Sequence, residues 1–106
     1  MFIVTEQGVI LSTESIQSIR SALNNLSIVA TYTNDRVIEI FSALSTDVSE
    51  TINNTIRKAL LNGFNVSLYK DDYEEHAPKN FLEMEELTPQ IKKVVVNNTV
   101  YFSIEQ

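Results

Sequence analysis

Cysteine is absent from this sequence, and glycine, proline and histidine are scarce. Without cysteine the chain has no disulfide, no thiolate nucleophile and no cysteine-ligated zinc site. The two glycines, Gly8 and Gly63, are too few and too far apart for a phosphate-binding loop or a dinucleotide-binding fingerprint. With only two prolines as well, the composition also argues against a long disordered linker.

Long apolar runs are missing too. No stretch approaches the ~20 apolar residues that span a bilayer. Residues 1–8, MFIVTEQG, lack the basic and apolar parts of a signal peptide. We therefore expect a cytoplasmic protein that does not bind membranes. The 106 residues fit a single domain, residues 1–106, and the 43% hydrophobic content suffices for one core.

The charge is unevenly distributed between the two signs. Fourteen acidic residues against eight basic ones give a formal net charge of −6. This balance argues against direct binding to nucleic acid or to anionic membranes, because both select basic patches. It is compatible with a basic protein as partner.

Residues 47–62 predict the one long helix of the chain. Asp47 and Glu50 are spaced as a capping box, and Gly63 can take the left-handed conformation that ends a helix. The apolar residues recur with helical spacing on one face, at Val48, Ile52, Ile56, Ala59 and Leu60. We expect this face to pack on the core, although an apolar stripe of this kind is also compatible with a partner groove.

Most other apolar segments predict short strands joined by tight turns. Two loops, Asn34-Asp35 and Asn97-Asn98, suit type I′ turns because Asn and Asp tolerate positive φ. Apolar side chains on both faces of residues 36–42 predict a central strand. The expected hairpins pair residues 2–5 with 9–12, residues 26–33 with 36–42, and residues 92–96 with 99–104.

Four segments give weaker signals. Residues 64–69 alternate apolar and polar side chains, which predicts a strand with one buried and one wet face. Residues 70–80 predict a polar, acidic connection. Residues 13–23 and 81–87 each fit either a short helix or an extended strand.

The expected fold class is α+β. We predict a mainly antiparallel sheet of about five to seven strands built from hairpins, with one main amphipathic helix packed on one face. Neither an internal repeat nor an alternation of strands and helices is evident.

Half of the acidic residues gather in one segment, residues 71–86. Such a cluster raises the local negative potential and attracts a basic partner. An ordinary solvated loop and helix face is the alternative interpretation. The candidate protein-binding residues are Asp71, Asp72, Tyr73, Glu74, Glu75, Glu83, Glu85 and Glu86.

We predict that the protein is not an enzyme. The segment DDYEEH, residues 71–76, offers oxygen ligands but lacks the ligand spacing and the glycine of a calcium loop, so we predict no metal site and no cofactor. His76 is the only histidine, and beside Glu74 and Glu75 it is a conceivable general base. A lone histidine in a charged loop is usually a surface residue, and no catalytic residue is predicted.

The leading hypothesis is a small acidic, non-catalytic protein–protein interaction module that acts through its acidic C-terminal half, through a sheet edge, or through both. Pairing of sheet edges would make a homodimer. The alternative is a phage-type inhibitor of a nucleic-acid-binding enzyme, such as an anti-CRISPR or anti-restriction protein, with a phosphate-mimicking surface. The chain is similar to such acidic inhibitors, or DNA mimics, in size and charge only. A third hypothesis is a small enzyme that uses His76 and the nearby acidic residues.

Overall fold

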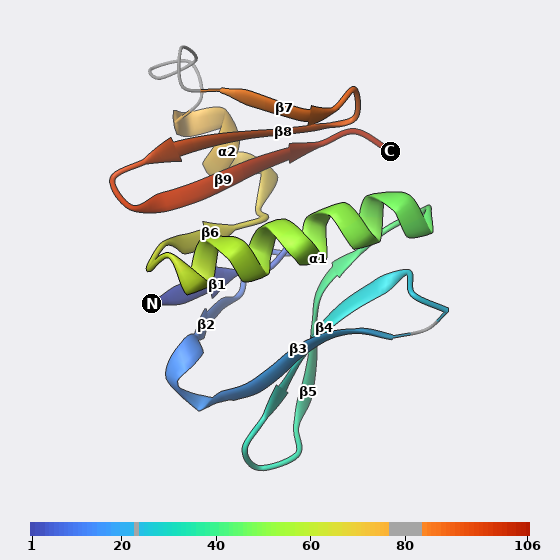
Figure 1. Ribbon diagram of the computed structural model, residues 1–106. Coiled ribbons are helices and arrows are strands. Elements are labelled where there is room, and N and C mark those ends of the chain that lie inside the picture. The colour runs from blue at the N-terminus through green and yellow to red at the C-terminus, as the bar shows by residue number, and fades with distance from the viewer. Residues whose placement is uncertain (23, 77–83) are drawn as a thin grey trace.

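The computed structural model describes residues 1–22, 24–76 and 84–106, which form nine strands and two α-helices (Figure 1). The α+β class is therefore as expected. The helices are α1 (Thr46–Leu61) and α2 (Lys70–His76), with a 3-10 turn η1 (Thr13–Ser15). The strands are β1 (Phe2–Val4), β2 (Ile10–Ser12), β3 (Ile16–Ala22), β4 (Ser27–Tyr32), β5 (Val37–Ser42), β6 (Asn65–Ser67), β7 (Glu85–Thr88), β8 (Ile91–Val96) and β9 (Thr99–Ile104).

The strands form two sheets rather than one. The larger sheet has six strands in the order β2-β1-β6-β9-β8-β7, and the smaller has three in the order β3-β4-β5. The predicted hairpins are all present, and the smaller sheet is antiparallel throughout. However, β6 runs parallel to both β1 and β9. The prediction of one mainly antiparallel sheet is corrected accordingly, because the chain crosses over through α1 before β6 enters the sheet.

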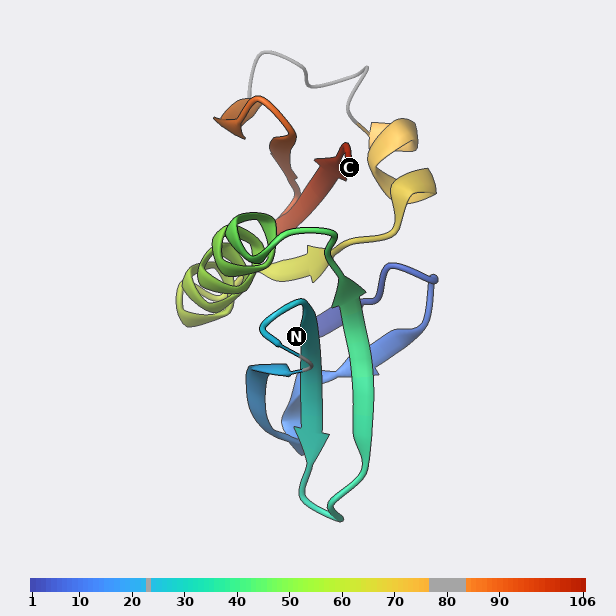
Figure 2. The same ribbon diagram turned by 90° about the vertical axis from the view of Figure 1, so that its right-hand side faces the viewer.

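The two helices cover opposite faces of the larger sheet (Figure 2). Helix α1 contacts β6 on one side and β3 and β4 of the smaller sheet on the other, so it lies between the two sheets (Figure 1). Helix α2 contacts β9 and β8 on the far face. The sequence predicted one main helix on the sheet, and the structure has a second helix, α2, on the opposite face.

The main core forms around α1. Val48, Ile52, Ile56 and Ala59 are buried as predicted, while Leu60 is half-buried at the edge of the core. They pack against apolar side chains from both sheets, including Ile3, Val66 and Phe102 from the larger sheet and Ile28 and Phe41 from the smaller one. One stripe of a single helix therefore joins the two sheets.

The start of α1 differs from the prediction. The helix begins at Thr46, and the N-cap is Ser45, whose side-chain oxygen accepts the Val48 N–H at 3.3 Å. The capping box predicted for Asp47 and Glu50 is wrong, because Ser45 already fills the capping position two residues earlier. Asp47 lies in the first turn, where its charge favours the positive end of the helix dipole.

The end of α1 is as predicted. Gly63 has φ +81°, and its N–H donates to the Leu60 carbonyl at 3.1 Å. The N–H of Phe64 donates to the Ala59 carbonyl at 2.9 Å. These two bonds define a Schellman motif, in which the left-handed residue lets the chain turn back and satisfies the last carbonyl groups.

A type I′ turn was predicted for two hairpin loops, and only one of the two loops has it. Asn97 and Asn98 have φ 49° and 64°, which confirms the type I′ turn between β8 and β9. Between β4 and β5 only Asp35 has positive φ, at 66°, and its N–H donates to the Tyr32 carbonyl at 3.0 Å. This three-residue loop is a type I turn followed by a left-handed residue, so the type I′ prediction there is wrong.

Two strands lie in positions other than those predicted. β5 is an edge strand of the smaller sheet, and β4 is its centre, so the prediction of a central strand at residues 36–42 is wrong. β6 is central and covered on both faces, and Ser67 on its supposedly wet face is only 1% exposed. Helix α2 covers that face and replaces water there.

The ambiguous segments are settled where the structure describes them. Residues 13–22 contain the turn η1 followed by strand β3. Residues 70–76, predicted as a connection, form α2 instead. Residues 85–88 form β7, while residues 77–83 lie outside the described residues.

Candidate functional site

The predicted acidic cluster falls mainly on α2. Five of the predicted residues, Asp71 to Glu75, lie in this helix, and Glu85 and Glu86 lie in β7. Glu83 lies outside the described residues. The helical periodicity of α2 divides its members into an inner face toward the sheet and an outer face toward solvent.

An aromatic stack fixes the end of α2 to the larger sheet. The His76 imidazole lies nearly parallel to the Tyr101 ring of β9, with ring centroids 4.3 Å apart and an angle of 12° between the planes. The His76 Nδ1 atom lies 2.8 Å from the Asp72 carbonyl oxygen. Because a carbonyl oxygen only accepts hydrogen bonds, Nδ1 is the donor in this contact. Burial raises the pKa of the Tyr101 hydroxyl.

Polar contacts also hold the inner face of α2. The Ser67 hydroxyl of β6 donates to the Asp72 carboxylate at 2.8 Å. The Tyr73 hydroxyl lies 3.5 Å from the Met84 sulfur, and burial raises the pKa of Tyr73. Asp72 and Tyr73 therefore serve mainly to attach the helix, and neither is fully exposed.

The outer face of α2 carries three exposed carboxylates, those of Asp71, Glu74 and Glu75. Their spacing of three and four residues places them within about one helical turn, a rise of about 5.4 Å. Lys70 approaches Glu74 at 3.7 Å, but both side chains are exposed, so the pair contributes little to stability. Asp71 accepts a hydrogen bond from the Tyr69 hydroxyl and thereby raises the pKa of that tyrosine.

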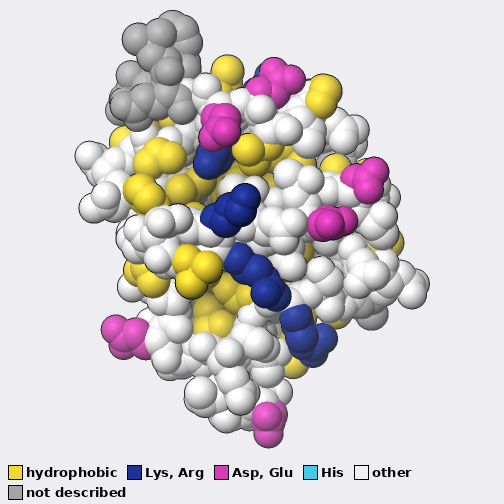
Figure 3. All heavy atoms as spheres, in the orientation of Figure 1, with side chains coloured by type: hydrophobic (Ala, Val, Ile, Leu, Met, Phe, Trp, Pro, Cys, Tyr) yellow, Lys and Arg dark blue, Asp and Glu magenta, His cyan; other side chains and the backbone are white. Residues whose placement is uncertain are grey.

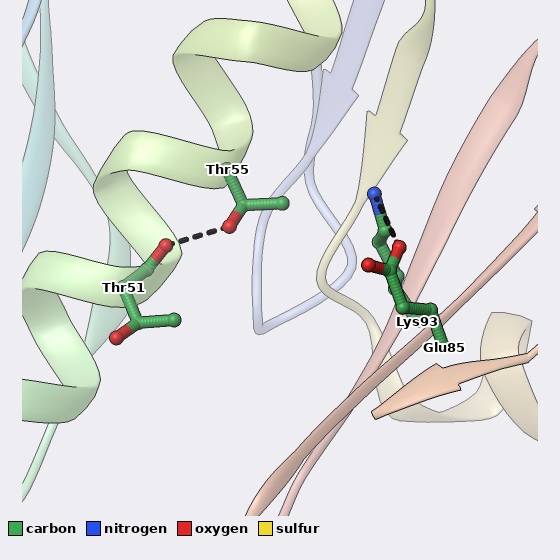
Figure 4. Close-up of polar contacts among 4 residues, drawn as sticks. All are labelled: Thr51, Thr55, Glu85 and Lys93. Carbon is green, nitrogen blue, oxygen red and sulfur yellow. Dashed lines mark hydrogen bonds and ion pairs between the residues drawn. The ribbon is translucent and has the colours of Figure 1, made fainter. Parts of the chain in front are cut away.

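The two acids of β7 lie on opposite faces of the sheet. Glu85 pairs in register with Lys93, and the Nζ atom lies 3.2 Å from the Glu85 carboxylate (Figure 4). Both side chains, together with Lys58 of α1, line a pocket between this helix and the larger sheet. Glu86 pairs in register with Lys92 on the face that α2 covers. The cluster that is continuous in sequence is thus divided in space, and lysines lie opposite its β7 members.

The face that carries α1 has basic side chains at its centre and acidic ones toward its margins (Figure 3). Lysine and arginine side chains form a row over this face, with apolar side chains exposed on either side (Figure 3). Arg57 and Lys58 are exposed on α1, and Arg57 lines an open groove of about 470 Å³ between α1 and β3. The sequence did not predict this groove. The sequence signal that could have indicated the groove was Leu61, an apolar residue outside the predicted buried stripe of the helix.

The described residues also bear on two other kinds of site, a membrane span and a metal centre. Neither helix has the length and apolar character needed to cross a membrane. No group of three or more His, Cys, Asp or Glu side chains is arranged to hold a metal ion in residues 1–22, 24–76 and 84–106. We compared the chain with protein-family models, with curated proteins and with solved structures, and none of the three comparisons found a match.

Proposed function

We propose that this protein is a small, non-catalytic binding module that presents the outer face of α2 to a basic region of another protein. The proposal rests on one observation. Asp72 and His76 attach α2 to the sheet, and Tyr73 contacts Met84 just before β7, so that Asp71, Glu74 and Glu75 all remain on the exposed side.

The attachment of α2 to the sheet favours binding, because the helix is ordered in advance. Its backbone is ordered before the partner arrives, so less conformational entropy is lost on association. Three like charges on one helical turn steer a basic partner and increase the rate of encounter, and salt weakens this effect. Asp71, Glu74 and Glu75 would supply the charge, and the half-buried Tyr73 the neighbouring apolar contact.

The test compares two charge-neutralised variants as bait in a cell extract. The first carries Asp71→Asn, Glu74→Gln and Glu75→Gln. The matched control carries Glu14→Gln, Asp47→Asn and Glu50→Gln, which remove the same charge from exposed positions elsewhere. We expect a basic protein to be retained at low salt by the wild type and the control, and lost by the α2 variant. Equal retention by all three baits contradicts the proposal.

The same experiment addresses the alternative of an inhibitor that mimics nucleic acid. Such an inhibitor uses its carboxylates in place of phosphates, so duplex DNA competes with it for the captured protein. Release of the partner by DNA at constant ionic strength favours the inhibitor. Retention in the presence of DNA favours a binding module with an ordinary protein partner.

A further inference from the structure

The groove between α1 and β3 runs along the edge of a strand. On the strand side it is lined by the consecutive residues 16–19, and on the helix side by Arg57, Leu60 and Leu61. Side chains alternate between the two faces of a strand. A groove lined by four consecutive strand residues therefore follows the backbone edge rather than one face of the sheet.

The outer edge of β3 is open to another strand. Within the described residues, β3 pairs with β4 alone, on its inner side. The register shifts at Gln17, and such a bulge leaves regular pairing from Ser18 onward. The Arg57 guanidinium donates to the Ile19 carbonyl oxygen. In an extended sheet that carbonyl would accept an N–H from the next strand, so Arg57 occupies the place of a missing donor.

Apolar side chains on both sides of the groove are exposed or only partly buried. Leu61 is 87% exposed at the end of α1, and Leu60 is half-buried beside it. Ile16 and Ile19 of β3 are also only partly buried against the core. An added strand would cover these side chains and remove apolar surface from water, which favours binding by about 25 cal/mol per Å².

The charge in the groove selects the partner. Arg57 is the charged residue among the groove-lining positions, and no acidic side chain among the described residues lines it, although the net charge of the chain is −6. Lys58 is exposed next to Arg57. An arginine at a binding edge pairs well with a carboxylate, because its planar donors match both oxygens.

We propose that this groove binds an extended, acidic segment of a partner protein, which adds as a strand to the edge of β3. A carboxylate of the segment takes the Arg57 guanidinium, and the freed Ile19 carbonyl accepts a backbone N–H of the segment. Alternate side chains of the added strand pack toward Leu60 and Leu61. The mode is strand addition, in which the backbone provides affinity and alternate side chains provide specificity.

A second copy of this chain is a poorer occupant. Symmetric pairing of two β3 edges would bring together two copies of Arg57 and of the neighbouring exposed Arg20. Like charges in that position oppose association. The groove and the outer face of α2 lie on separate elements with opposite charge, so the two proposals stand independently.

The test uses a synthetic peptide of seven residues, blocked at both ends, with threonine at every second position and valine or glutamate at the others, so that one face of the strand presents both valine and glutamate to α1. Its analogue with glutamine in place of glutamate is the control for charge. Binding is followed by the backbone amide signals of the labelled protein in an NMR titration. We expect the acidic peptide to shift the signals of residues 16–22 and of the end of α1, and the glutamine peptide to bind at least about tenfold more weakly.

Two protein variants separate Arg57 from general charge. Arg57→Gln should weaken binding of the acidic peptide by about tenfold, because it removes the partner of the carboxylate. Lys58→Gln removes the same charge from the adjacent position and should change affinity by less than about twofold. Equal losses in the two variants would show non-specific attraction and overturn the proposal.

Two further measurements address the backbone and the occupant. Methylation of alternate peptide nitrogens removes the donors on one edge, and it should abolish binding if the peptide adds as a strand. Signals that shift on α2 instead of β3, or a concentration-dependent dimer through β3 in sedimentation, would overturn the proposal. The α2 triple variant should bind the peptide normally, so failure of one proposal is distinguishable from failure of the other.

Discussion

His76 and Tyr101 are stacked face to face, and this contact joins the last turn of α2 to the centre of β9. A stacked aromatic pair is worth about 0.5–1.5 kcal/mol beyond the area that it buries. We predict that His76→Ala lowers the free energy of unfolding by about this amount and increases amide hydrogen exchange in α2. Glu75→Ala, on the outer face of the same helix, is the control and should leave exchange at the inner face unchanged. Equal exchange in both variants would mean that the stack does not hold the helix.

The capping residue of α1 gives a second prediction. Ser45→Ala removes the acceptor for the Val48 N–H and should cost about 1 kcal/mol of stability. Asp47→Ala loses only an exposed charge near the helix dipole and should cost about 0.3–1 kcal/mol. Urea unfolding at neutral pH measures both values. Ser45→Asp restores an acceptor, so it should recover most of the lost stability. A larger loss of stability in Asp47→Ala than in Ser45→Ala would contradict the assignment of Ser45 as the N-cap.

The stripe that joins the two sheets gives a third prediction. Ile52 is 0% exposed between them, and Ile52→Ala should lower the free energy of unfolding by about 2–5 kcal/mol, through lost burial and a cavity. Leu61→Ala shortens an apolar side chain of the same helix that is exposed, so it should change stability by less than about 0.5 kcal/mol. Urea unfolding of both variants provides the comparison. Similar losses would place Leu61 in the core rather than in an open groove.

Glu6 links folding to pH. Burial raises the pKa of its carboxyl group, and the Glu39 carboxylate raises it further, whereas the Ser42 N–H, which donates to Glu6 at 3.2 Å, lowers it in part. A raised pKa in the folded state means that the folded protein holds this proton more tightly than the unfolded chain does. The resulting stabilisation is complete below the ordinary value of 4.5 and is lost as pH rises through the folded pKa.

The fourth prediction follows from this direction. Glu6→Gln cannot ionise, so it should be more stable than the wild type near neutral pH. The difference should shrink as pH falls through the raised pKa of Glu6, and the decrease should be complete below about 4.5. Thermal unfolding across this range measures the difference. Glu6→Asp keeps a titrating carboxyl group and should retain a rise of the same sign on acidification. A stability difference for Glu6→Gln that does not vary with pH would contradict this account.

Local signals in the sequence were sufficient for several parts of the fold. The buried stripe of α1 follows from helical spacing, its end from Gly63, and the turn between β8 and β9 from Asn97-Asn98. Each depends on residues that are close in sequence. The start of α1 was misplaced because Ser45 and Asp47 are both good capping residues, and only the backbone shows which one lies outside the helix.

Long-range pairing explains what the sequence did not show. The position of β6 between β1 and β9 depends on contacts between distant segments, and no local pattern encodes its neighbours. Likewise, the division of the acidic cluster depends on register. Alternation separates Glu85 from Glu86 in any strand, but only the pairing of β7 with β8 places Lys93 and Lys92 opposite them.

The parallel placement of β6 also has a consequence for the time course of folding. Hairpins such as β8-β9 close locally, on a scale of about 1–10 μs. Val66 pairs with Ile3 on one side and with Val100 on the other, so the two halves of the larger sheet can join only after distant segments have met. Closing those long loops costs entropy before any contact rewards it, and it slows folding. Until β6 is inserted, the β1-β2 hairpin and the strands β7, β8 and β9 remain two separate parts, and the larger sheet has no centre.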